Sequence, residues 1–244
     1  MSVAGAVIIS AIAVCINPRS ANNSKLITLD ANLFIEDEGH PKSPHLAYFN
    51  FFNRDDLVFN EMGTYFITAT LAGVGAALSN KTAGLEDVDY AAVGDIRSII
   101  PAGGPDSVDP AQAPLLTVSG AVVASEIDYF DLAPEQYVSA LRDCPRRPTF
   151  PVRCFIKDSK RWGSGSRKPR PMGGQYIMAS GIFEAVVRND EKKVIRFEME
   201  LTDLAYLGRS VLPVSSSQAG ASAGSGSANG KGKDKAFSYA TSPA

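Results

Sequence analysis

The chain has 244 residues, of which 45% are hydrophobic and 20% are charged, so it can bury a core and is not disordered throughout. Its formal net charge of −2 excludes a uniformly basic protein but leaves room for a local basic face. With 2 His and 3 Cys, it offers neither a multi-ligand Cys/His zinc site without outside ligands nor a disulfide framework.

An internal repeat divides the chain. Residues 3–12 match residues 118–127, residues 62–69 match residues 172–179 after one insertion, and residues 93–99 match residues 201–207. The three matches are collinear, and loop insertions and deletions explain why their offset drifts from 115 to 108. The sequence therefore predicts two tandem copies of one domain at residues 1–100 and 115–212. A Pro/Gly-rich linker at 101–114 joins them, and a flexible Ser/Gly/Ala/Lys-rich tail follows at 213–244.

Each copy shows strand signals in chain order. In the first copy, residues 25–35 and 46–54 are typical of strands. In the second copy, residues 118–130, 150–158, 175–188 and 194–207 predict strands, with a polar hairpin turn at 188–193. Residues 135–141 are ambiguous, and we interpret them as a short strand by analogy with residues 25–35. Gly120 and Gly181 lie inside two of these strands and predict bends.

About five strands per copy, two of them long and bent at glycines, can close into a small barrel. The pattern resembles the five-stranded OB-fold. The resemblance rests on the bent first strand, on the run MGGQYIMASG at residues 172–181, and on the strand that contains Asp203 and Leu204. Tandem OB-folds with a short linker are similar to the DNA-binding core of replication protein A and related single-strand binders. The resemblance implies an all-β protein with two OB-fold-like barrels; a pair of β-sandwich modules is the alternative.

The charge is distributed unevenly between the copies. Residues 1–100 contain 6 Lys+Arg and 11 Asp+Glu, whereas residues 146–170 contain nine basic residues and one acid, Asp158. Single-strand binding needs cations for the phosphates and aromatic faces for the bases. The candidate nucleic-acid-binding residues are Arg153, Phe155, Lys157, Lys160, Arg161, Trp162, Arg167, Lys168 and Arg170. The competing interpretation is a solvated basic loop in which Trp162 closes the end of the barrel.

The matching strand of the first copy, residues 46–54, is aromatic and nearly uncharged, and Asp55 and Asp56 follow it. Such a field repels phosphate. The aromatic residues are either core, or they belong to an accessory domain that binds a protein or packs against its twin. If the chain is instead an interaction or assembly module, the interface residues are Phe49, Phe51, Phe52 and Phe59.

Little in the sequence favours an enzyme. His40 and His45 lie in a Pro-containing segment that we interpret as a surface turn, and Cys15 and Cys154 occupy apolar strand positions typical of a core. Gly-Ser-Gly at 163–165 lacks the Lys of a phosphate loop. We therefore expect a non-enzymatic, intracellular (nuclear or cytoplasmic) protein with no cofactor, metal or membrane partner. It binds single-stranded DNA, or RNA, through its second copy; a β-sandwich shell or carbohydrate-binding protein is a third possibility.

Overall fold

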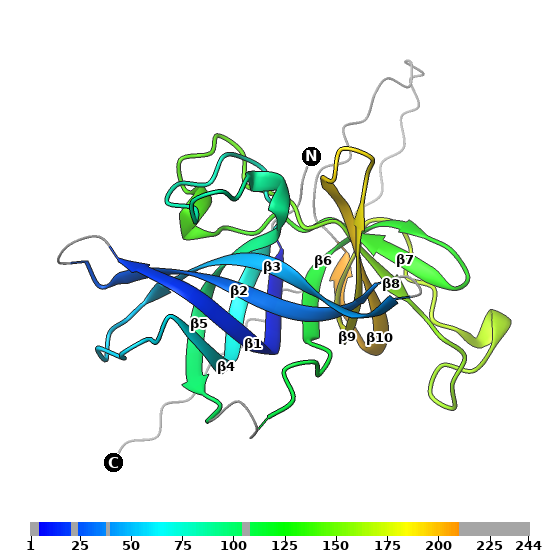
Figure 1. Cartoon of the computed structure of the whole chain (residues 1–244). Helices are drawn as coiled ribbons and strands as arrows, with labels where there is room; N and C mark the ends of the chain where they lie inside the picture. Colours follow the sequence, from blue (N-terminus) through cyan, green and yellow to red (C-terminus); the bar gives the residue numbers. More distant parts are fainter. Residues whose placement is uncertain (1–4, 21–23, 38–39, 104–107, 210–244) are drawn as a thin grey trace, which may run out of the picture. The chain divides into compact units, whose positions relative to one another are not determined.

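The computed structural model describes residues 5–20, 24–37, 40–103 and 108–209, and all of them belong to one compact unit, Met1–Ser210. The described residues form strands and three single-turn 3-10 helices, so the predicted all-β class is confirmed (Figure 1). The predicted tail at residues 213–244 lies outside the described residues.

The first five strands form a closed circuit of hydrogen-bonded pairs, which we call ring one. The circuit runs β1–β2–β3–β5–β4 and back to β1, and every pair is antiparallel except β3–β5. The strands are β1 (Ala6–Ser20), β2 (Leu26–Asp37), β3 (His40–Phe52), β4 (Met62–Ala72) and β5 (Tyr90–Pro101). The 3-10 turn η1 (Asp87–Asp89) immediately precedes β5.

The next five strands repeat this circuit as ring two. It runs β6–β7–β8–β10–β9 and back to β6, again with one parallel pair, β8–β10. The strands are β6 (Leu115–Ser125), β7 (Tyr129–Leu132), β8 (Val152–Phe155), β9 (Gln175–Arg188) and β10 (Val194–Arg209), with η2 (Ser139–Leu141) and η3 (Gly165–Arg167) in the connections. The shared circuit matches the small closed barrel to which the sequence shows a resemblance.

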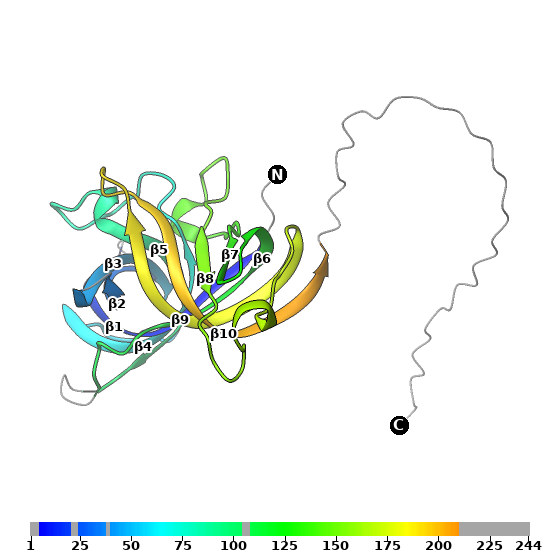
Figure 2. The same cartoon turned by 90° about the vertical axis from the view of Figure 1, so that its right-hand side faces the viewer.

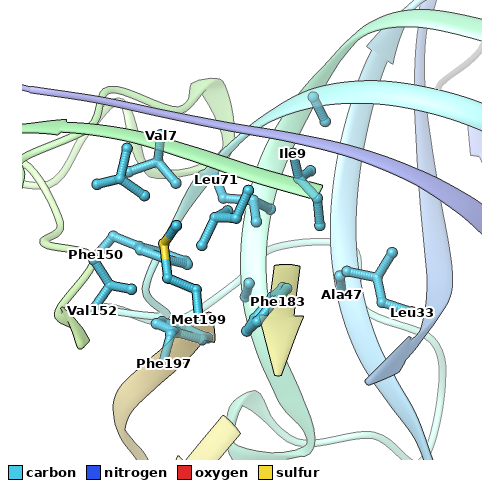
Figure 3. Packing of buried hydrophobic residues seen from close by; sticks show 14 of the residues in the cluster. Val7, Ile9, Leu33, Ala47, Leu71, Phe150, Val152, Phe183, Phe197 and Met199 are labelled. Carbon is cyan, nitrogen blue, oxygen red and sulfur yellow. The ribbon is translucent and has the colours of Figure 1, made fainter. Parts of the chain in front are cut away.

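The two rings are joined edge to edge. β1 and β6 pair antiparallel from Ala6–Ser119 to Ser10–Leu115, so both circuits belong to one ten-stranded sheet (Figure 1). Their buried apolar side chains also form one continuous cluster, and Figure 3 shows members from both rings. In ring two the Phe150 and Phe197 rings stack with centroids 3.9 Å apart, and Phe183 meets Phe197 edge-on at 5.8 Å. The division of the chain into two domains, with boundaries at residues 100 and 115, stays a prediction.

β9 and β10 form a long, curved ribbon (Figure 2). Their register shifts at several points, one of them beside the Gly181–Leu201 pair. A Cβ atom at Gly181 would lie 2.0 Å from the Glu200 carbonyl oxygen, so glycine is required where the strands approach this closely. The connecting turn at 189–193 contains no glycine, and Lys192 adopts the left-handed conformation there with φ 62°. The predicted hairpin is confirmed.

Several sequence predictions differ from the structure. The residues taken as a strand at 135–141 contain only a single bridge at Glu135 and the turn η2; the second strand of ring two is instead β7. The predicted 118–130 strand is therefore two strands, β6 and β7, separated by a turn at 126–128. The segment expected to be a surface turn around His45 belongs to β3, and His45 is buried.

The first and second repeat matches imply different registers for the first strand. Ala13 lies opposite Tyr65 and Ala121 lies opposite Tyr176, so aligning the two tyrosines, as the second match does, gives an offset of 108 residues for the first strand, whereas the first match gives 115. Both strands alternate Val or Ile with small residues, which makes several alignments look similar. Gly5 and Gly120, which the sequence match aligned, face the same residue, Pro134.

Candidate nucleic-acid interface

The candidate residues Arg153 and Phe155 lie on the outward face of β8. Val152 and Cys154 point inward and are fully buried, whereas Arg153 and Phe155 are partly exposed, as the alternation predicts. The strand is shorter than predicted and ends at Phe155, but Ile156 remains buried and Lys157 exposed. Burial raises the pKa of the Cys154 thiol, and Asp131 raises it further, so this cysteine is a neutral core residue.

β7 completes this outward face. Arg153 donates two hydrogen bonds to Asp131, at 2.8 and 2.9 Å, and its guanidinium lies 3.8 Å from the centroid of the Tyr129 ring. The bonds from Arg153 to Asp131 hold the pKa of the guanidinium above its ordinary value. Tyr129 also meets Phe155 edge-on, with centroids 6.1 Å apart. The outward face of β7 and β8 therefore carries two aromatic rings, Tyr129 and Phe155, beside the ion pair of Arg153 and Asp131.

Carboxylates from distant strands neutralise two more candidate cations. Lys157 forms ion pairs with Glu184 of β9 and with Glu200 of β10, the latter at 2.7 Å. Arg161 forms an ion pair with Asp203 of β10. These acids lie outside residues 146–170, so the local charge of that segment overstates the positive field at the surface.

Lys168 does not belong to an exposed surface. Its side chain is only 5% exposed, and its Nζ bonds to Asp128 at 2.6 Å and Asp158 at 2.7 Å. Lys168 therefore ties the loop of residues 156–174 to the turn between β6 and β7, and it has a structural role. The sequence analysis placed Lys168 among exposed cations, and the burial of its side chain corrects that placement.

Trp162 combines both interpretations made from the sequence. The indole is partly buried against the apolar cluster, and its Nε1–H donates to the Leu201 carbonyl oxygen at 3.2 Å. The Arg161 guanidinium lies 4.7 Å from its ring centroid. The indole is therefore neither fully exposed nor fully buried, because one side of it packs onto the protein.

Besides Lys157 and Arg161, which are exposed but ion-paired, three further candidate cations are exposed: Lys160, Arg167 and Arg170. Within the described ranges, no carboxylate forms an ion pair with any of them, and the one side-chain hydrogen bond of Arg167 goes to the Ser164 hydroxyl, at 3.4 Å. Arg170 lines an open groove of about 450 Å³ together with Val123, Ile127 and Met172. The segment around these cations contains no α-helix, only the turn η3.

The sequence interpretation missed Tyr129 and the acidic partners. The outward position of Tyr129 could have been predicted from the sequence, because Phe130 and Leu132 alternate with outward residues and are buried. Glu184, Glu200 and Asp203 carry no such signal, since only the sheet register brings them to Lys157 and Arg161.

The aromatic strand of ring one is largely core. Phe49 and Phe51 are buried in the apolar cluster, Phe59 packs against it, and only Phe52 is strongly exposed, at 64%. The prediction that these four side chains form an interface is therefore wrong for Phe49 and Phe51, because both are buried.

Within the ranges that the structure describes, no three His, Cys, Asp or Glu side chains are grouped to hold a metal ion. The same ranges contain no helix long and apolar enough to cross a bilayer.

Among the comparisons with known proteins, the comparison with solved structures gives a match. No protein-family model matches the chain, and no curated protein sequence is similar to it. Among solved structures, it is similar to a deletion mutant of the single-stranded DNA binding protein from Thermus aquaticus. The TM-score is 0.44 at 14% identity, over 86% of this chain and 97% of that one.

Proposed function

We propose that the protein binds single-stranded DNA without catalysing a reaction, through ring two. Two observations carry the proposal: the outward face of β7 and β8 holds partly exposed aromatic rings, and the loop that follows β8 holds exposed cations with no carboxylate partner in the described ranges. Tyr129 and Phe155 lie on the β7–β8 face, and Lys160, Arg167 and Arg170 lie in the following loop. Bases stack on such rings, at about 1–3 kcal/mol per base, while cations follow the phosphates.

A direct titration tests this proposal. Fluorescence anisotropy of a labelled oligothymidylate should report saturable binding that weakens as salt rises, and duplex DNA of the same length should compete poorly. The same titration with oligouridylate distinguishes DNA from RNA. Equal binding of duplex and single strand would contradict stacking as the basis of recognition.

A protein-interaction function is the second candidate, and one observation favours it. Phe66 of β4 lies directly opposite Ile100 of β5, and both are exposed, at 45% and 58%. With Leu115 they line a shallow cavity of about 260 Å³. Exposed apolar patches of this kind are typical of interaction surfaces. The mass of the protein in solution, measured by light scattering, separates self-assembly from a monomeric binder.

A further inference from the structure

Ring one contains a counterpart of the β7–β8 face. β2, β3 and β5 occupy the same places in ring one that β7, β8 and β10 occupy in ring two, with the same antiparallel and parallel pairings. The outward residues in the middle of β2 and β3 are Thr28, Asp30, Tyr48 and Asn50; Leu26 and Phe52, at the end of the same face, are exposed. All four are buried, at 6% exposure or less, whereas their counterparts in ring two are partly exposed.

A segment of ring two covers part of this face. The β4–β5 connection of ring one covers the rest, since the Tyr48 hydroxyl donates to the Ser79 carbonyl at 2.6 Å and Thr82 donates to Asp30. The connection from β7 to β8 places η2 against β3 and β5, and the Asp95 carboxylate accepts hydrogen bonds from the backbone N–H of Ser139, at 2.8 Å, and from its hydroxyl. Asn50 donates to the same hydroxyl at 2.9 Å and accepts from Thr28 at 3.1 Å. A chain of polar contacts thus runs from β2 across β3 to the covering segment.

Apolar contacts complete the cover. Val138 and Leu141, at 1% and 5% exposure, join a cluster with Tyr48, Tyr90 and Val93 on the outward side of ring one. This cluster is separate from the main core, so the covering segment forms a second buried layer there.

The beginning of the covering segment is fixed to β1. The Gly5 N–H donates to the Glu135 carbonyl at 3.2 Å, and the Val7 N–H donates to the Gln136 side-chain oxygen at 3.0 Å. A Cβ atom at Gly5 would lie 2.4 Å from Pro134 Cβ, so the close approach needs glycine.

We propose that residues 134–141 are the built-in occupant of the outward face of ring one, so that each molecule presents a single nucleic-acid face, that of ring two. The inference rests on the proposed function. The chemistry of the covered face supports it, because the Asp95 carboxylate, which forms no ion pair in the described ranges, accepts hydrogen bonds from the Ser139 amide and hydroxyl and repels phosphate. Nucleic acid does not replace this occupant.

Hydrogen–deuterium exchange on the full chain tests the cover without any ligand. Amides of residues 138–141 should be protected in the wild type. Asp95→Ala, which removes the acceptor of two hydrogen bonds, should accelerate their exchange more than tenfold and leave the β9–β10 amides unchanged. Asp143→Ala, at an exposed position near η2, is the matched control and should have no effect. If Asp95→Ala does not fold, Ser139→Ala still removes the hydroxyl contacts. Unprotected amides in the wild type would overturn the proposal.

Binding stoichiometry tests the second half of the inference. Calorimetric titration with an oligothymidylate of about 16 nucleotides, the upper site size for one OB-fold, should saturate at one oligonucleotide per chain for the wild type and for Ser139→Ala. Two bound per chain, or a second site that appears in the variant, would overturn the single-face inference. Absence of any binding would contradict the proposed function instead, and the exchange experiment would still decide whether ring one is covered.

Discussion

At the scale of single residues, partners distant in sequence decide what each candidate cation can do. Arg153, Lys157 and Arg161 were correctly expected near the surface, but each is held by a carboxylate from another strand. The alternation of buried and exposed positions in β8 was predictable, because it depends only on neighbours in the chain. The ion pairs were not predictable, because they depend on the register of β9 and β10.

Two contributions of Trp162 to stability, the packing of its ring and its hydrogen bond, can be separated. We expect Trp162→Ala to lower the free energy of unfolding by about 3 kcal/mol, the low end for a buried tryptophan, because one side of the indole packs on the core. Trp162→Phe should lose only about 1 kcal/mol, since it keeps most of the ring and removes the hydrogen bond to Leu201. Denaturant titrations give both values. Equal losses for the two variants would show that packing of the ring contributes nothing.

We expect the Asp30 carboxylate to make the stability of the protein fall at acid pH. Burial alone would raise its pKa, but hydrogen bonds from Arg19 and Thr82 outweigh burial and lower the pKa below its ordinary value. A lowered folded-state pKa stabilises the protein above the unfolded value of about 3.9, and this contribution is lost as the pH falls through the folded-state pKa. The unfolding free energy should therefore fall steeply below about pH 4.

Asp30→Asn should remove part of this dependence. At pH 7 we expect a loss of about 3 kcal/mol, because Arg19 then lacks its carboxylate partner in a largely buried site. Asp56→Asn breaks an exposed ion pair with Lys25 and should cost less than about 1 kcal/mol. Denaturant titrations at pH 7 and pH 3.5 check both variants. An unchanged acid slope in Asp30→Asn would contradict this assignment.

At the scale of elements, patterns identified the long strands and the alternation of β8 but missed the short strand β7. The β9–β10 hairpin and β2 were predictable from alternation and length. The four-residue β7 was missed because the turn before it, residues 126–128, contains neither Gly nor Pro. Residues 135–141 were misread as a strand because Val138 and Leu141 are buried against ring one, a contact that sequence alone does not reveal.

Gly181 tests the close approach inside the β9–β10 ribbon. Gly181→Ala should destabilise the protein by about 1–3 kcal/mol, because its new methyl group would overlap the Glu200 carbonyl oxygen. Gly173→Ala is the matched control, since no atom lies within 4 Å of a Cβ placed there. Thermal unfolding of both variants measures the difference. Equal melting temperatures would contradict the contact that we assign to Gly181.

At the scale of the whole molecule, the repeat was predictable but the asymmetry between its halves was not. Collinear sequence matches indicated two copies, and two identical strand circuits are present. The copies differ in exposure because the β7–β8 connection of ring two packs on ring one. A sequence comparison within the chain shows which parts are alike and does not show which part covers the other.

The salt dependence of single-strand binding tests the central claim most directly. The slope of log K against log salt should flatten by about 2 in the triple variant Lys160→Gln, Arg167→Gln, Arg170→Gln, since each lost phosphate contact changes it by about 0.7. Arg97→Gln removes an exposed cation of ring one and should leave the slope unchanged. Anisotropy titrations of oligothymidylate at several salt concentrations give both slopes. An unchanged slope in the triple variant, or an equal change in Arg97→Gln, would contradict binding through ring two.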